Sequence, residues 1–294
     1  MMKKMLMLVA VLVFVMAGCS SKKMTFVHVH GLGYSSDGKK IYIPAHDGLV
    51  AYSEGKWTTV KGEKHDYMGF STVDGGFYSS GHPAPGSSLP NPLGIVKSAD
   101  EGKTLQSLGF DGEADFHGMA VGYKSHAIYV FSPQRNSKMS SAGMYYSKDD
   151  SKTWNISAMN GLNGGLSALA VHPTNDNEVA VGTQNGLYIS NDNGHNFETI
   201  FAGKQVTSVY FGNKGELYAG GYSDKAFLLK IDPNSKNRTE ITIPALSKED
   251  AIAYIAQNPM KEQEIVFATF KKSIYRSKDK GANWTEIADQ GKTK

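Results

Sequence analysis

Short runs of Val, Ile, Tyr and Phe, separated by Gly, Asn and Asp, recur along most of the chain after residue 24. Runs of this length with turn residues between them predict β-strands. The pattern is clearest in one unit, where it predicts four strands at residues 166–171, 178–182, 186–190 and 197–201. Residues 248–256 could be read as a helix, but they fall where the first strand of another unit is due. The pattern therefore predicts an all-β protein.

One motif repeats together with these strands. The pattern Ser-x-Asp-x-Gly-x-x-aromatic occurs at residues 190–197 and 277–284, with variants at 98–105 and 147–154. Ser and Asp side chains can bond the backbone amides of a tight turn, Gly accepts a positive φ, and the aromatic residue anchors the next strand. The motif aspartates are therefore interpreted as structural and not catalytic: Asp100, Asp149, Asp192 and Asp279.

The spacing of these aspartates sets the number of repeats. They lie 49, 43 and 87 residues apart, so the last interval holds two periods, and residues 231–243 stand where a motif has been lost. Residues 52–57 are a degenerate copy upstream. Six units of about 44 residues would use about 264 of the 276 residues that follow residue 18. Four antiparallel strands per unit at this period predict a single six-bladed β-propeller over residues 25–294.

The repeated motif resembles the Asp-box, or BNR repeat, of sialidases, sortilin-type receptors and related propellers. The resemblance implies either a glycoside hydrolase or a protein-binding and assembly scaffold. The resemblance implies that a sialidase would hold the carboxylate of sialic acid with three arginines. This sequence has only three arginines in total, two of them in the last two units: Arg135, Arg238 and Arg276. A sialidase is therefore not expected. A hydrolase of a neutral glycan needs two carboxylates about 5–10 Å apart. Its candidate catalytic residues are Asp47, Asp66, Asp115 and Glu113.

The first residues have the pattern of an export signal. Lys3 and Lys4 precede an apolar run at residues 6–17, which is too short to span a bilayer as a helix. The run ends in Met16-Ala-Gly-Cys19, and Cys19 is the only cysteine, so no internal disulfide can form. This ending resembles a lipobox, although that family more often has Leu in place of Met16. The resemblance implies a signal peptide at 1–18, acylation of Cys19, a tether at 19–24, and a body held at the membrane outside the cytoplasm.

Charge gives little sign of a polyanionic partner. Loss of the signal segment would remove two lysines and no acid, which lowers the formal net charge from +3 to +1. The few arginines are widely spaced, and no basic cluster of the kind that follows a phosphate backbone is present. Nucleic acid is therefore not an expected partner, and we expect a monomer.

Propeller topology predicts that most of the nine histidines share one face. In each blade the start of the innermost strand and the end of the second strand lie on one face, and the motif turn lies on the opposite face. Aligned units place His30, Met68 and His117 at one position, near which the later units carry Ala168, Ser208 and Tyr254. The predicted metal-ligating set gathers over the first three units: His28, His30, His46, Met68, His82 and His117.

A ring of imidazoles with one thioether predicts a transition-metal site. Copper is the first choice because a thioether selects its reduced form, and zinc is the second because Asp66 or Asp115 could supply a carboxylate. Iron held by His and carboxylate is a further alternative, and the acids could instead orient metal-bound imidazoles. Two insertions, at residues 83–93 and 132–142, lengthen loops on the same face. His65, just before an innermost strand, is expected on the same face. The other three histidines are expected elsewhere, as structural or surface residues: His126, His172 and His195.

Overall fold

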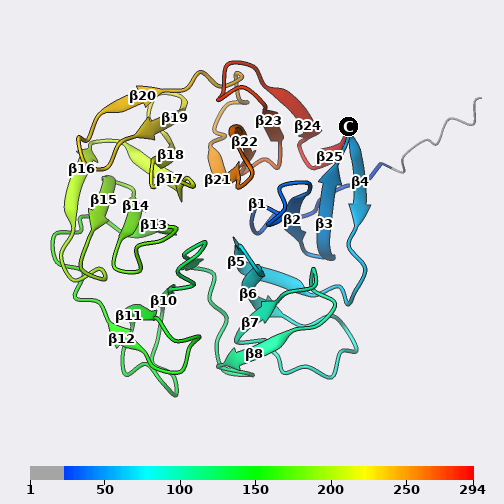
Figure 1. Cartoon of the computed structure of the whole chain (residues 1–294), viewed down its shortest axis with the longest axis vertical. Helices are drawn as coiled ribbons and strands as arrows, with labels where there is room; N and C mark the ends of the chain where they lie inside the picture. Colours follow the sequence, from blue (N-terminus) through cyan, green and yellow to red (C-terminus); the bar gives the residue numbers. More distant parts are fainter. Residues whose placement is uncertain (1–22) are drawn as a thin grey trace, which may run out of the picture.

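The chain forms six antiparallel sheets, five of four strands and one of five, arranged as blades around a central axis (Figure 1). The structure is a computed structural model that describes residues 23–294. The expected signal peptide and the acylated Cys19 lie outside the described residues. The predicted all-β, six-bladed propeller is confirmed, and residues 248–256 lead into a strand. Within residues 23–294 there is no helix, hence none that could cross a membrane.

Each blade takes consecutive strands of the chain, with the innermost strand first. Blade 1 contains β1 (Gly33–Tyr34), β2 (Ile41–Ala45), β3 (Gly48–Ser53) and β4 (Lys56–Thr59). Blade 2 contains β5 (Asp66–Val73), β6 (Gly76–His82), β7 (Ile95–Ser98) and β8 (Gln106–Gly109). Blade 3 contains β9 (Met119–Val121), β10 (Ile128–Ser132), β11 (Gly143–Ser147) and β12 (Asn155–Ile156).

The later blades repeat this order. Blade 4 contains β13 (Leu166–Val171), β14 (Val179–Thr183), β15 (Gly186–Ser190) and β16 (Glu198–Ala202), all within one residue of the predicted strands. Blade 5 contains β17 (Gln205–Phe211), β18 (Leu217–Tyr222), β19 (Ala226–Ile231) and β20 (Arg238–Glu240). Blade 6 contains β21 (Ile252–Asn258), β22 (Lys261–Thr269), β23 (Ile274–Ser277), β24 (Thr285–Asp289) and a short fifth strand, β25 (Lys292–Thr293).

The ring closes where the two ends of the described chain meet. Thr25 forms an antiparallel bridge with Lys292 of β25, and the amide of Phe26 donates a hydrogen bond of 2.7 Å to the carbonyl of Gly291. The chain then runs toward the axis to begin blade 1. The first residues after the expected tether thus complete the outer edge of the last blade, which ties blade 6 to blade 1.

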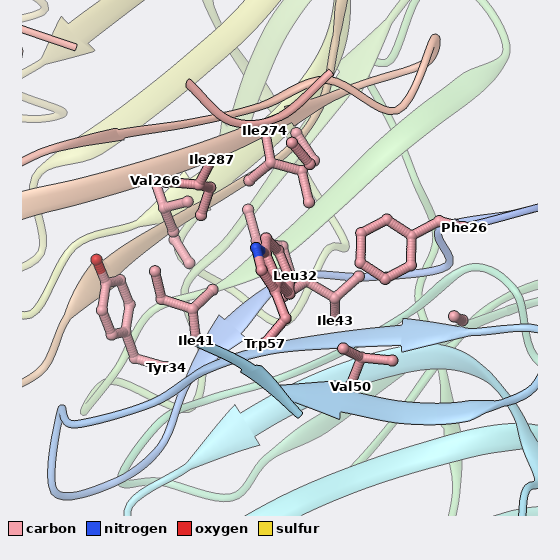
Figure 2. Packing of buried hydrophobic residues seen from close by; sticks show 14 residues of the cluster. Phe26, Leu32, Tyr34, Ile41, Ile43, Val50, Trp57, Val266, Ile274 and Ile287 are labelled. Carbon is pink, nitrogen blue, oxygen red and sulfur yellow. The ribbon is translucent and has the colours of Figure 1, made fainter. Parts of the chain in front are cut away.

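An apolar cluster fills the junction between blades 1 and 6 (Figure 2). Phe26 packs edge-on against Trp57 with ring centroids 5.3 Å apart, and Figure 2 shows Ile43 beside them and Val266 and Ile274 arriving from blade 6. The three aliphatic side chains are fully buried. Burial of one such side chain contributes about 1.5–3 kcal/mol. Similar clusters fill the other junctions, so each blade is held by its neighbours.

Four Ser-x-Asp turns join the third and fourth strands of blades 2, 3, 4 and 6. In blade 4, Ser190 Oγ donates to Asp192 Oδ1 at 2.7 Å and accepts the amide of Gly194 at 2.9 Å. Asp192 Oδ1 also accepts the amide of Asn196 at 2.9 Å. The same bonds recur in the other three turns. The carboxylates that carry these turns are thus occupied locally, as predicted: Asp100, Asp149, Asp192 and Asp279.

Four of the innermost strands contain a bulge near their start. The register of β13 shifts between Leu166 and Ala168, and equivalent shifts occur in β5, β17 and β21. In β5 the bulge contains Gly69 at φ 54°, where a Cβ atom would lie 2.3 Å from the carbonyl oxygen of Phe116 in blade 3. Only glycine allows this approach. The bulges also explain why the aligned repeats differ by one residue.

Strand direction defines two faces of the ring. Adjacent strands of a blade are antiparallel, so the starts of the innermost strands and the turns between second and third strands lie on one face, here termed the site face. The Ser-x-Asp turns lie on the opposite face.

Candidate metal centre

Asp66, the first residue of β5, lies between two histidines of blade 1 on the site face. His46, in the turn between β2 and β3, places Nδ1 2.7 Å from Asp66 Oδ2. His30, which precedes β1, places Nε2 3.5 Å from Asp66 Oδ1. One ligand atom from each of the three side chains lies within 4.8 Å of the others. This group is termed the Asp66 centre.

Two atoms of the Asp66 centre are buried without a hydrogen-bond partner in the described structure, namely Asp66 Oδ1 and His30 Nε2. Leaving a buried polar atom unpaired costs about 1–3 kcal/mol. Their separation of 3.5 Å is too long for a strong hydrogen bond. Two ligands of one tetrahedral ion, with bonds of about 2.0–2.1 Å, lie about 3.4 Å apart. The pair is therefore spaced as two ligands of one ion would be.

The surroundings of His30 favour its uncharged form. Burial lowers the pKa of His30, the negative charge of Asp66 opposes this, and the neighbouring His28, His117 and His46 lower the pKa further. The neutral imidazole is the form that binds a metal. His28 is exposed and stacks on His30, with ring centroids 5.7 Å apart and an interplanar angle of 20°. Its ring also meets that of His46 edge-on at 6.1 Å.

Asp115 forms the hub of a second cluster, between blades 2 and 3. His117 Nε2 lies 2.7 Å from Asp115 Oδ2, and Nε2 of His82, the last residue of β6, lies 3.3 Å from the same oxygen. Asp115 Oδ1 is buried and has no hydrogen-bond partner in the described structure. We term this group the Asp115 cluster. The six side chains predicted as one ring thus include two histidine pairs, each gathered on its own carboxylate.

The structure places two other predicted residues differently from these clusters. Met68 in β5 is only 8 % exposed, lies at the bulge and is not among the residues that line the central cavity. Asp47 is exposed in the turn between β2 and β3. Sequence reasoning treated Asp66 and Asp115 as candidate catalytic acids, zinc ligands or orienting acids, but it did not predict that each would gather a pair of histidines. The signal was present, because each lies two residues before an aligned position of its repeat.

A central cavity of about 280 Å³ opens along the axis and is lined by the innermost strands of the blades. His30 and His117 line it on the side of blades 1–3. The later blades contribute Ala168, Ser208 and Tyr254, which are the residues that the repeat alignment placed near the equivalent position of their units. The histidine-rich part of the channel mouth therefore faces a wall of small and aromatic side chains.

The two insertions are anchored by buried residues. In the 83–93 loop, Leu93 is buried and its amide donates to the carbonyl of Gly81 at 2.8 Å, while the amide of Ala84 donates to Nδ1 of His65 at 3.0 Å. His65, which accepts this hydrogen bond from the loop, is 2 % exposed, and burial lowers its pKa. In the 132–142 loop, Met139 is 1 % exposed and packs in an apolar cluster.

The other three histidines lie at turns of the opposite face. Nε2 of His126, between β9 and β10, lies 2.7 Å from Asp74 Oδ1. Nδ1 of His172, between β13 and β14, accepts the amide of Asn175 at 2.9 Å. His195 belongs to the Ser-x-Asp turn of blade 4. The side chain of His126 thus joins turns of neighbouring blades, whereas that of His172 stabilises its own turn.

Comparisons with known proteins bear on the fold. No family model matches the chain, and no curated protein does. A GH74 enzyme from Niastella koreensis has 15% sequence identity and a TM-score of 0.58 over 91% of this chain and 46% of its own. The GH74 xyloglucanase from Xanthomonas campestris has 18% identity and a TM-score of 0.56, with the same two coverages. YCF48, in complex with a D1 peptide, has 14% identity and a TM-score of 0.52 over 90% of this chain and 83% of its own.

All of these share the β-propeller fold with this chain. The chain spans less than half the length of the two GH74 enzymes. At identities of 14–18% the likeness shows the fold alone. Function has to be argued from the site.

Proposed function

We propose that this protein is an exported lipoprotein whose propeller binds a divalent transition-metal ion through His30, His46 and Asp66. The observation that carries the proposal is the convergence of three donors within 4.8 Å, two of whose atoms are buried and otherwise unpaired. Three protein ligands leave a further coordination position open to water or to a bound molecule. Acylation at Cys19 would hold this centre at the membrane surface outside the cytoplasm.

The donor set favours zinc or copper(II). Two imidazoles and one carboxylate suit both ions, and an N/O site of this kind binds copper(II) more tightly than zinc. Iron, which also accepts His and carboxylate, is the third ion to be tested. The proposal rests on the Asp66 centre and does not require the thioether of Met68, which was the reason to consider reduced copper.

Metal titration of the soluble body tests the proposal. A chain of residues 20–294 includes every described strand and the closure between blades 6 and 1, and it should carry no metal-binding tag. Calorimetric titration with Zn²⁺ and with Cu²⁺ should show binding that His30→Ala and His46→Ala each weaken at least about tenfold. Even the residues that hydrogen-bond to metal ligands typically change metal affinity by about 10–100-fold when they are mutated. His172→Ala, on the opposite face, is the matched control. Equal affinity in all four proteins would refute the proposal.

Hydrolysis of a neutral glycan is the second candidate, favoured by the GH74 likeness and by two largely buried carboxylates on the site face. The side chains of Asp66 and Asp115 are 12% and 16% exposed. A glycosidase needs such a pair about 5–10 Å apart. The hydrolase would be supported if metal-free protein turned over aryl glycosides and Asp66→Asn or Asp115→Asn abolished this turnover.

A further inference from the structure

We propose that the central channel receives a small molecule with one anionic metal-binding group and an uncharged aromatic body. The anionic group occupies the open coordination position of the Asp66 centre, and the body lies in the channel. This inference rests on the proposed function and deepens it, because it names the class of ligand that the metal ion holds. The position of the centre, the charges of the channel wall and an adjoining groove support it.

The Asp66 centre lies at the mouth of the channel. His30 lines the central cavity, whereas the side chain of His46 is 60% exposed on the site face. Nε2 of His30 and Oδ1 of Asp66 are shielded from solvent. An ion bound to these atoms therefore has protein on one side. Its open position faces the exposed side, where the channel meets the site face.

The channel wall carries no group with a fixed charge. Among the described residues that line the cavity there is no Asp, Glu, Lys or Arg. Apart from His30 and His117 near the mouth, the ionisable residues that line it are tyrosines. Burial raises the pKa of Tyr123 and of Tyr210 to about 12 and also raises that of Tyr254, so all three are neutral at pH 7. A charged ligand body would lose its hydration here without gaining a partner. The body is therefore uncharged.

The metal ion supplies the positive charge that a ligand in the channel can pair with. A divalent ion bound by two neutral imidazoles and the single carboxylate of Asp66 keeps one net positive charge. Asp115 does not bind this ion, since its Oδ2 faces His117 and His82 at 2.7 and 3.3 Å. One anionic group on the ligand thus neutralises the centre, and a second would have no partner in the wall.

A shallow groove continues the channel toward the junction of blades 6 and 1. Ala253, Tyr254 and Phe270 line both the cavity and the groove. Phe270 is 61% exposed and Val27, across the groove, is 57% exposed; they are two of the five large apolar residues exposed among those described. Lys272 is the charged residue of the described groove, and its Nζ donates to the carbonyl of Val27 at 3.3 Å. Exposed aromatic and apolar surface at this point favours a ligand with an aromatic body.

The size of the channel limits the size of the ligand. Its volume of about 280 Å³ lies just below the range of about 300–1,000 Å³ for pockets that enclose drug-sized molecules. The expected ligand is therefore one aromatic ring with one metal-binding group. Benzohydroxamate has this form, because it binds zinc as a monoanion and carries a phenyl ring. Acetohydroxamate has the same metal-binding group with only a methyl group, which makes it the matched control.

Calorimetric titration of benzohydroxamate into the Zn²⁺-loaded chain of residues 20–294 tests the inference. Benzohydroxamate should bind at least about tenfold more tightly than acetohydroxamate, because only its phenyl ring is large enough to gain burial in the channel. The metal-free chain should bind benzohydroxamate at least about tenfold more weakly than the loaded chain, because it lacks the partner of the anionic group.

The outcomes separate this inference from the proposed function. Equal binding of the two hydroxamates to a chain that does bind Zn²⁺ would overturn the aromatic ligand and leave the metal centre intact. Equal binding of benzohydroxamate with and without Zn²⁺ would place its anionic group elsewhere, for example at Lys272, and would also overturn the inference. A chain that binds no Zn²⁺ would overturn both.

Two pairs of variants test whether the body lies in the channel. Ala253→Trp places a large ring where the channel meets the groove, so it should weaken benzohydroxamate binding at least about tenfold and leave Zn²⁺ affinity unchanged. Ala282→Trp, at an exposed residue of the opposite face, is its control and should change neither affinity. Phe270→Ala removes an exposed ring without opening the core and should weaken benzohydroxamate binding by about 2–10-fold. Its control is Met260→Ala, at a residue that is 67% exposed between β21 and β22.

The Phe270 pair decides the matter if Ala253→Trp also loses Zn²⁺ binding. Benzohydroxamate affinity that is the same in Phe270→Ala as in Met260→Ala would then show that the body lies outside the channel and the groove. The inference would be overturned by that result.

Discussion

Substitution of Ser190 by alanine tests how the Ser-x-Asp turns hold the blades. Ser190 is 1 % exposed, and its Oγ accepts the amide of Gly194 at 2.9 Å and donates to Asp192 at 2.7 Å. Alanine fits the same space but leaves the amide of the buried Gly194 without a partner, which costs about 1–3 kcal/mol. For a domain of this size each kcal/mol lowers the melting temperature by about 2–4 °C, so Ser190→Ala should lower it by roughly 2–12 °C.

Thermal unfolding followed by circular dichroism measures this effect. Ser88→Ala, at an exposed serine of the 83–93 loop, is the control and should melt within 1–2 °C of the wild type, because surface substitutions change stability by less than about 0.5 kcal/mol. If Ser190→Ala melts with the control, the serine is a marker of the repeat without an energetic role. The reasoning about the turn would then be refuted.

Two further predictions concern pH and ring closure. Hydrogen bonds from Asn196, the backbone amide first, lower the pKa of Asp192 from 3.8 to about 2, so this carboxylate stabilises the fold above pH 3.8 and the gain is lost as the pH falls through 2. The melting temperatures of Asp192→Asn and the wild type should therefore differ at pH 7 and converge near pH 2. The same difference in melting temperature at both pH values would contradict this prediction. Phe26→Ala should lower the free energy of unfolding in urea by about 3–5 kcal/mol, because Phe26 is 3 % exposed at the closure. Val27→Ala, at the exposed neighbouring residue, should lower it little. Equal losses of stability in the two variants would contradict the prediction.

The fold could be predicted from the sequence because its determinants are local and repeated. The turn at Ser190 and Asp192 is built from residues within a few positions of one another, so its pattern can be read directly from the chain. The strand runs of blade 4 agreed with the structure to within a residue for the same reason. Ring closure could not be predicted, because the pairing of Thr25 with Lys292 joins residues from opposite ends of the chain and leaves no periodic signal.

The site was predicted less completely than the fold. Repeat alignment correctly placed the histidines on one face, since strand direction alone decides which end of a blade a residue occupies. It could not show that His46 would reach across to Asp66 and His82 to Asp115, because these contacts depend on how neighbouring blades are rotated against each other. The bulge at Met68 could not be predicted either, because it depends on the contact of Gly69 with blade 3.

The difference between the turn aspartates and the site aspartates follows from their positions in the blade. Asp192 begins a turn whose free amide and side-chain groups lie within four residues, and both of its oxygens are used there. Asp66 begins an innermost strand whose backbone groups are already paired with β6, so its partners must come from the adjacent blade. That blade offers imidazoles, which leave one carboxylate oxygen unpaired. A carboxylate at or shortly before the start of an innermost strand is therefore available to a ligand in a way that a turn carboxylate is not, and Asp66 and Asp115 both lie there.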